Sequence, residues 1–97
     1  MWKTNFLELG RIKEKSKNLV FFEYNLPLPE GFKIISMRSS CGCSVPNEEP
    51  DGISVEYKSA AVPPQLETQG EYTAVKKITV ETNQGDFILE FRATVYK

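Results

Sequence analysis

Two cysteines one residue apart carry the most specific chemistry in this chain. Cys41 and Cys43 flank Gly42, and they are the only cysteines among 97 residues, which include no histidine. Without an imidazole, the chain has no side chain that ordinarily titrates near neutral pH and serves as a general base. A cysteine nucleophile needs such an activating neighbour. The sequence therefore predicts a non-enzymatic protein that binds no cofactor.

One role for the pair is a disulfide bond inside the tripeptide. Residues i and i+2 of an extended strand share a face and lie about 6.6 Å apart. Bridged cysteines usually have Cα atoms about 4.4–6.8 Å apart, so closure is feasible, and Gly42 supplies the flexibility that it needs. A bridge over so short a loop would stabilise the fold little. We expect such a bridge to be labile enough for redox chemistry.

A metal site and a structural corner are the other two roles. Structural zinc takes four ligands, so two thiolates suffice only if two Cys-Gly-Cys units meet across a dimer. The acidic neighbours Glu48, Glu49 and Asp51 do not favour a thiolate, and they lack the Asp-x-Asp-x-Asp-Gly pattern of a calcium loop. Cysteine also packs as a small apolar side chain. We favour this last role, with the pair at a strand corner against Met37 and Phe91.

Alternating apolar and polar residues predict β-strands on both sides of the tripeptide. The clearest alternation places Ile53, Val55 and Tyr57 on one face of a strand. Prolines and glycines between such runs mark turns, among them a polar turn at 46–52 and a hairpin at 83–86. We expect strands at 6–10, 18–24, 32–38, 53–58, 71–82 and 87–96, with a short edge strand near 61–62.

Strand parity predicts which side chains share a face. If no bulge intervenes, the strand before the cysteines continues one face through Ile35, Met37, Ser39, Cys41, Cys43 and Val45. In the segment 71–82, an apparent change of parity indicates a β-bulge near Lys76 and Lys77. The last strand carries Phe87, Leu89, Phe91, Ala93 and Val95 on one face.

The order of these elements predicts the fold class. Short strands separated by turns, with no convincing helical periodicity, are typical of a β-sandwich. We therefore expect an all-β protein in which residues 1–97 form a single immunoglobulin-like antiparallel β-sandwich of about seven strands.

Several stretches of the chain resemble a bacterial family of unknown function whose members carry a Cys-Gly-Cys-Thr signature. The stretches are 6–13, 20–25, 34–46, 53–55, 77–83 and 87–96. In this chain Ser44 stands where threonine is usual, and we expect no export signal of the kind that many members carry. The family is similar to the hydin-like and major-sperm-protein-like branch of immunoglobulin sandwiches. The resemblance therefore implies the same fold.

Charge and hydropathy exclude several classes of partner. The chain has 12 Lys and Arg against 13 Asp and Glu, with a net charge of −1, so it lacks the basic face that nucleic acid requires. No segment approaches the run of about 20 apolar residues that spans a membrane. Near the start, Glu8 interrupts the region where a secretory signal needs apolar residues. We expect a soluble protein in the cytoplasm or in a virion.

These features together predict a structural or protein-interaction module. Fold-level analogy favours a phage virion protein, as a decoration or tail-associated subunit. The expected partners are other proteins, a larger assembly or further copies of the chain. Trp2 and Tyr96, near the two ends, are candidate partner contacts, or they close the ends of the sandwich. The alternative function is a small redox-active or metal-binding protein that uses Cys41 and Cys43.

Overall fold

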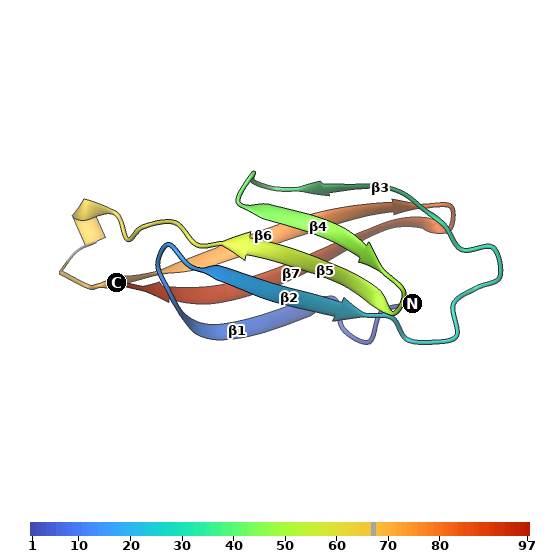
Figure 1. Cartoon of the computed structure of the whole chain (residues 1–97), viewed down its shortest axis with the longest axis horizontal. Coiled ribbons are helices and arrows are strands. Elements are labelled where there is room, and N and C mark those ends of the chain that lie inside the picture. Colours follow the sequence, from blue (N-terminus) through green and yellow to red (C-terminus); the bar gives the residue numbers. More distant parts are fainter. Residues whose placement is uncertain (67) are drawn as a thin grey trace.

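The computed structural model describes residues 1–66 and 68–97. In these ranges the chain is all-β, apart from a short 3-10 turn at Pro64–Leu66. Among the described residues there is no helix with the length and apolar character that a membrane span requires. The strands are β1 (Phe6–Lys13), β2 (Lys17–Glu23), β3 (Ile34–Ser39), β4 (Ser44–Glu49), β5 (Gly52–Lys58), β6 (Glu71–Thr82) and β7 (Gly85–Tyr96) (Figure 1).

The strands form two sheets that lie face to face. One sheet has the strand order β1-β7-β6-β3, and the other has the order β2-β5-β4 (Figure 1). The pairs within them are antiparallel except that β1 runs parallel to β7. The expected purely antiparallel arrangement is therefore wrong at this pair. These two strands are far apart in sequence, so no hairpin fixes their relative direction.

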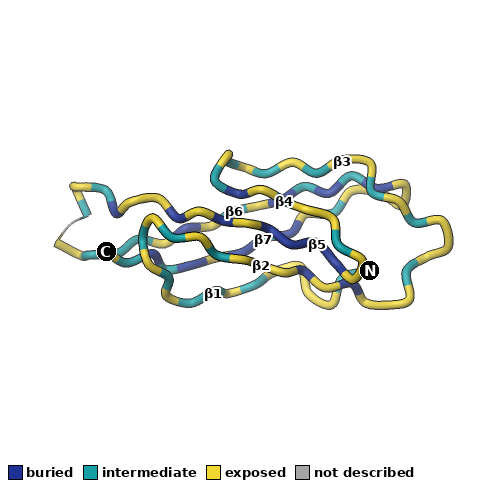
Figure 2. Tube along the Cα trace, viewed as in Figure 1, coloured by how far each residue is buried: buried dark blue, intermediate teal, exposed yellow. Residues whose placement is uncertain are grey.

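The core lies between the two sheets and is built from alternate residues of their strands. Tyr57 of β5 meets Phe91 of β7 across it, with ring centroids 5.2 Å apart. Figure 2 shows buried segments along β5 and β7 and exposed or half-buried segments along β3. The predicted inward faces of 53–58 and 87–96 are confirmed. Their fully buried members are Ile53, Val55, Tyr57, Leu89, Phe91, Ala93 and Val95.

The β-bulge predicted near Lys76 and Lys77 is wrong. The two residues pair with Phe91 and Glu90 in a β6–β7 ladder that runs without a register shift from Glu71 to Thr82. The parity of the strand does not change, because Tyr72 and Ala74 fall on the same face as Ile78. Val75 lies on the outer face with 47% of its surface exposed.

The irregularity lies in β3 instead. The register of β3 with β6 shifts between Ile34 and Ser36, so Ile34 packs against the core while Ile35 is 65% exposed. The prediction that Ile35 shares a face with Met37, which holds only without a bulge, is therefore wrong. Val45 does not continue that face either, because the turn at 41–43 leads into another strand, and it is 53% exposed. The prediction assumed an uninterrupted strand, and one extra residue reverses the face of everything before it.

The predicted polar turn at 46–52 is largely a strand. Residues Ser44–Glu49 form β4 and pair with β5, and a hairpin loop of Pro50 and Asp51 joins the two strands. An edge strand can be polar and contain proline, because one of its sides faces no other strand. The short edge strand expected near 61–62 does not form.

Candidate functional site

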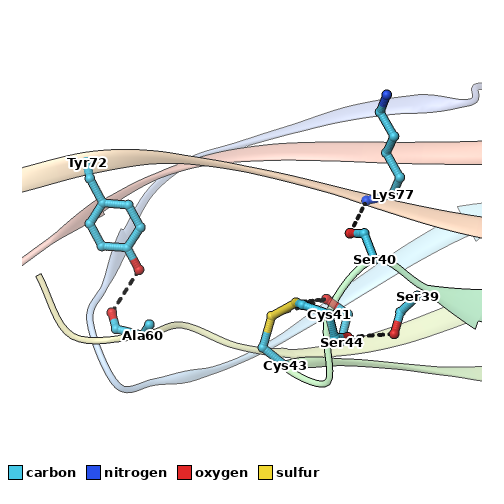
Figure 3. The surroundings of a disulfide bond; sticks show 8 residues. All are labelled: Ser39, Ser40, Cys41, Cys43, Ser44, Ala60, Tyr72 and Lys77. Atoms are coloured by element: carbon cyan, nitrogen blue, oxygen red, sulfur yellow. Dashed lines mark hydrogen bonds between the residues drawn. A yellow bond between two sulfur atoms is a disulfide. The ribbon is translucent and has the colours of Figure 1, made fainter. Parts of the chain in front are cut away.

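The two cysteines lie in the connection between β3 and β4, where a disulfide joins them (Figure 3). Their Cα atoms are 5.3 Å apart, because residues 41–43 bend into a turn instead of continuing the extended strand. Of the three roles considered from sequence, the structure has the disulfide and not the free thiols that we favoured. The packing role survives in part, since Cys43 contacts the hydrophobic core.

Hydrogen bonds hold this corner independently of the sulfur atoms. The hydroxyl of Ser39 donates to the carbonyl of Cys41 over 2.6 Å, and the amide of Lys58 in β5 donates to the carbonyl of Cys43 over 2.9 Å. On the other side, the amide of Ser40 donates to the carbonyl of Lys77 in β6 over 2.9 Å. The corner is thereby fixed to both sheets.

The tip of the corner is open to solvent. Gly42 is exposed, and a Cβ atom added to it would meet nothing within 4 Å. The two cysteines are half-buried, and the buried Ser44 places its hydroxyl 3.9 Å from each sulfur. Among the described residues, no group of three or more Cys, Asp or Glu side chains is arranged to hold a metal ion. Within one chain the tripeptide thus offers an accessible disulfide.

The two aromatic residues expected near the ends of the fold do lie at opposite ends of β7. Trp2 is half-buried, pairs with Tyr24 as an isolated bridge, and lies with its ring 5.1 Å from Tyr24 and 6.0 Å from Phe87. Tyr96 lies beneath two cations, with Arg11 at 5.1 Å from its ring centre. Trp2 therefore closes one end of the core, and a partner contact at either residue stays a prediction.

The outer face of the four-stranded sheet carries ion pairs beside exposed apolar side chains, which include Phe6, Val75 and Ile88. The pairs are Glu8–Arg92, Arg11–Glu71, Lys77–Glu90 and Arg38–Glu81. The hydrogen bond from Arg92 lowers the pKa of Glu8 below its ordinary value, and the amide of Gly10 adds to the effect. Exposed pairs of this kind add little stability each, but together they keep this face hydrated.

The outer face of the three-stranded sheet also exposes apolar side chains. On β2, Leu19 is 76% exposed and Phe21 is 37% exposed. Val45 of β4 lies on the same row as Leu19, with Glu56 of β5 between them. Sequence reasoning missed this face. Its signal was present, because the run 18–24 is apolar at both parities, as expected of a strand that is apolar on both sides.

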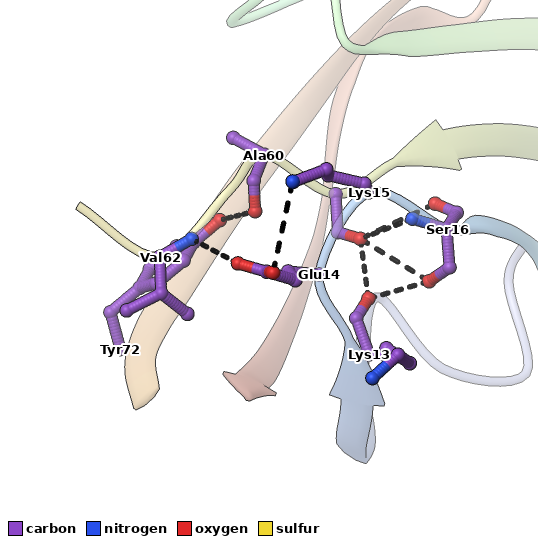
Figure 4. Close-up of polar contacts among 8 residues, drawn as sticks. Lys13, Glu14, Lys15, Ser16, Ala60, Val62 and Tyr72 are labelled. Atoms are coloured by element: carbon purple, nitrogen blue, oxygen red, sulfur yellow. Dashed lines mark hydrogen bonds and ion pairs between the residues drawn. The ribbon is translucent and has the colours of Figure 1, made fainter. Parts of the chain in front are cut away.

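The start of β2 is fixed by a cluster of polar contacts at the β1–β2 turn (Figure 4). The hydroxyl of Ser59 donates to the carbonyl of Lys13 over 2.6 Å and accepts from the amide of Ser16 over 3.0 Å. The carboxylate of Glu14 accepts from the amide of Val62 over 2.7 Å. Because the connection after β5 supplies these partners, the turn cannot swing away, and β2 begins at a defined position at the edge of its sheet.

Comparisons with known proteins give no family. No protein-family model matches the sequence, and no curated protein matches it. The resemblance to the Cys-Gly-Cys-Thr family accordingly stays a prediction.

Proposed function

We propose that this chain is a non-enzymatic structural and protein-interaction module with an immunoglobulin-like fold. If the strands after the first are lettered B to G, the sheet order β2-β5-β4 corresponds to B-E-D and the order β3-β6-β7 to C-F-G, as in immunoglobulin domains. In this assignment the first strand joins the C-F-G sheet, whereas constant-type domains place it beside B.

The observation that carries the interaction role is the edge of β2. This strand lies at the margin of its sheet and exposes Leu19 and Phe21 on the outer face. An edge strand offers unpaired backbone groups to another chain, and neighbouring apolar side chains add contact area and specificity. The outer face of the opposite sheet combines ion pairs with exposed apolar side chains such as Ile88, so the matched control below is placed there.

Within this class we place the protein in a larger assembly. A phage virion, with the chain as a decoration or tail-associated subunit, is the assembly that fold-level analogy favours. The place of action would then be the virion, or the cytoplasm of the cell that builds it.

Site-specific photo-crosslinking in the organism that makes the protein tests the interaction role. A benzophenone amino acid replaces Leu19 in one variant, and it replaces Ile88, which is 58% exposed on the opposite sheet, in the matched control. We expect crosslinked protein from position 19 and much less from position 88, with the attached protein identified by mass spectrometry. Absence of crosslinks at position 19, or equal crosslinking at both positions, contradicts the proposal.

The disulfide supports a second candidate function, which is thiol–disulfide exchange with a protein dithiol. A thiolate of the partner attacks one sulfur of the Cys41–Cys43 bond and releases the other as a thiolate. The second thiol of the partner then resolves the mixed disulfide, so the partner is oxidised and Cys41 and Cys43 are reduced. The half-buried sulfurs at an open corner are the observation that favours this role.

Equilibration with glutathione buffers, followed by alkylation and intact mass measurement, tests the exchange. The exchange role predicts that the pair changes between oxidised and reduced forms within the range of cellular glutathione potentials. A bond that stays fully oxidised in the most reducing of these buffers contradicts it. The crosslinking result does not depend on this outcome, so the two functions are tested separately.

A further inference from the structure

We propose that Lys76 stabilises the thiolate of Cys41 when the disulfide opens, and that this charge favours oxidation of dithiol partners by the pair. The inference rests on the proposed exchange function and names the residue that tunes it. It depends on three features of the corner: the position of Lys76 on β6, the different surroundings of the two cysteines, and the distribution of the other charged groups.

The first feature is that Lys76 lies on the inner face of β6 without a partner. It falls on the same row as Ala74 and Ile78, which are both buried in the core, and it is itself half-buried. It makes no hydrogen bond or ion pair with the described part of the chain. The neighbouring Lys77 lies on the outer face and pairs with Glu90 over 3.9 Å. The ammonium group of Lys76 is therefore free to stabilise a negative charge that forms beside it.

The pairing of β3 with β6 brings Cys41 next to this lysine. The amide of Ser40 donates to the carbonyl of Lys77 over 2.9 Å, and the hydroxyl of Ser40 accepts from the amide of Lys77 over 3.1 Å (Figure 3). One residue further in the same antiparallel register, Cys41 comes opposite Lys76, on the same face. The sulfur of Cys41 lies on the inner side because it is bonded to Cys43, which contacts the core. The flexible four-carbon stem of a lysine can bring its ammonium group to such a neighbour.

The second feature is that the two cysteines adjoin different sheets. Cys41 follows β3 and lies beside β6, whereas the carbonyl of Cys43 accepts the amide of Lys58 in β5, and Cys43 packs against the core. Apolar surroundings raise the pKa of a thiol, and a neighbouring lysine lowers it. The hydroxyl of the buried Ser44 lies 3.9 Å from each sulfur, so it does not distinguish between them. Cys41 is therefore the sulfur that holds a negative charge more readily when the bond opens.

The third feature is that the acidic residues close in sequence lie far from the corner. The proximity of Glu48, Glu49 and Asp51 in the sequence argued against a thiolate. In the structure, β4 carries them to its other end and into the hairpin with β5. At about 3.3 Å per residue, Glu48 lies about 13 Å along the strand from Ser44. This distance exceeds the Debye length of about 8–10 Å, so these carboxylates do not oppose the charge of Lys76.

The other titratable residues on the inner faces around the corner are tyrosines. Burial raises the pKa of Tyr57 in β5 and the pKa of Tyr72 in β6 above their ordinary values, so both stay neutral in the pH range of the exchange. The inner residues of β7 are apolar. Arg38 and Lys58 are exposed on the outer faces. Among the described residues around the corner, Lys76 is thus the cation on the inner side.

The exchange then has a defined order. A thiolate of the partner attacks the sulfur of Cys43, and the thiolate of Cys41 leaves beside Lys76, because a thiol of lower pKa leaves faster. The partner's second thiol attacks the partner's own sulfur in the mixed disulfide and releases Cys43, which takes up one proton. Two electrons pass from the partner to the pair, and the second proton goes to solvent while Cys41 stays charged. Lys76 thereby stabilises the reduced form, which makes the pair more oxidising.

Thiol alkylation tests the charge on Cys41 directly. The variant Cys43→Ser keeps this thiol alone, and the hydrogen bonds of the corner do not need the sulfur atoms. The rate of reaction with iodoacetamide between pH 6 and pH 10, followed by intact mass, gives the midpoint of ionisation. In this background Lys76→Gln should raise the midpoint by about half a pH unit or more, and Lys76→Arg should retain the parental value. The matched control Lys77→Gln removes the adjacent lysine from the outer face and should leave the midpoint unchanged.

Equilibration with glutathione measures the consequence in the chain with both cysteines. At pH 9 and a fixed glutathione mixture, Lys76→Gln should lower the ratio of reduced to oxidised protein about twofold or more, because the thiolate is less stabilised. At pH 6, where Cys41 is protonated, Lys76→Gln and the wild type should have the same ratio. Lysine side chains ordinarily stay charged up to about pH 10, so the dependence on pH comes from the thiol. Circular dichroism confirms that every variant is folded.

Two results would overturn the inference. One is an alkylation midpoint that responds to both Lys76→Gln and Lys77→Gln or to neither. The other is a loss of reduced protein in Lys76→Gln that is equal at pH 6 and pH 9, which marks a structural effect. Failure of the exchange function is a different result, in which the wild-type bond stays oxidised in every glutathione buffer. The alkylation midpoint of Cys43→Ser needs no exchange, so it decides in that case too whether Lys76 stabilises the thiolate of Cys41.

Discussion

The strands β2 and β4 are the two edges of one sheet, yet they differ on both faces. On the inner face, β2 buries Val20 and Phe22, and Tyr24 directly after the strand is also buried. Each of the three is no more than 3% exposed. On β4, the half-buried Pro46 lies across β5 from Val20, and the exposed Glu48 lies across β5 from Phe22. One edge thus anchors the core through large side chains. The other is joined to the sheet mainly through its ladder with β5.

The outer faces of the two strands also differ, in how apolar their side chains are. On β2 the outer side chains Leu19 and Phe21 are apolar although burial in the core does not require them, because Val20 and Phe22 already supply that contact. On β4 the outer positions are Val45, Asn47 and Glu49. An edge strand that is apolar on both faces resembles a central strand that lacks one neighbour. The proposed interaction role therefore predicts a neighbouring chain on the β2 side of the sheet and none on the β4 side.

Shortening a side chain on the inner face should give the largest difference in stability between the two edge strands. Phe22→Ala removes a side chain with no exposed surface, and we expect it to lower the free energy of unfolding by about 3–5 kcal/mol. Pro46→Ala on β4 removes a half-buried ring and should cost less than about 1 kcal/mol. Urea denaturation followed by circular dichroism measures both. Similar losses for the two variants would show that β4 anchors the core as firmly as β2.

Adding a methyl group at Gly52 should destabilise β2 more than β4. Gly52 of β5 pairs with both Glu23 and Glu49, but an added Cβ would lie 2.3 Å from the carbonyl oxygen of Phe22 and 2.8 Å from the ring of Phe21. Both contacts belong to β2. We expect Gly52→Ala to cost about 1–3 kcal/mol and to weaken amide protection in β2 more than in β4, as measured by hydrogen exchange.

The matched control for this substitution is Gly42→Ala. A Cβ atom at Gly42 meets nothing within 4 Å, so the change should be within about 0.5 kcal/mol of the wild type. If Gly52→Ala also leaves the free energy of unfolding unchanged, the close approach of β2 to β5 does not require glycine at this position. If it exposes β4 amides first, the anchored edge is β4 and the comparison is reversed.

The parts of the fold that were predictable are those where burial dictates the side chain. In β5 and β7 every second residue is in the core, and the alternation at Ile53, Val55 and Leu89 could be read directly. The strand β4 was missed because pairing with β5 fixes the conformation of its backbone but places little requirement on the type of its side chains. The shift in β3 was missed because an extra residue leaves no mark in composition, and the direction of β1 because pairing with β7 is non-local.

The candidate site was predictable only in its components. The sequence locates Cys41 and Cys43 and places them between strands, but the turn that brings their Cα atoms to 5.3 Å depends on bonds from Lys58 and Lys77 in other strands. Likewise, the apolar outer residues of β2 are visible in the sequence. That no described strand covers them is a property of the sheet order, which a single sequence does not specify.

The smallest expected effect is the electrostatic influence of β4 on Tyr24 at the end of β2. Burial raises the pKa of Tyr24 above its ordinary value, and the carboxylate of Glu48 on β4 raises it further. Because the pKa in the folded state is the higher one, the stabilising contribution is fully present below the unfolded pKa of about 10. It is lost as the pH rises through the folded value.

Ultraviolet titration of the phenol groups measures this coupling, with Tyr24→Phe used to assign the step that belongs to Tyr24. In Glu48→Gln the pKa of Tyr24 should fall toward its ordinary value but stay above it, because burial is the larger cause. The fall in the free energy of unfolding should still begin near the unfolded pKa of about 10, but it should be smaller and end at lower pH, because the folded and unfolded values lie closer together. A Tyr24 step that does not move in Glu48→Gln would mean that β4 exerts no field on the end of β2, and the two edges would then be electrostatically independent.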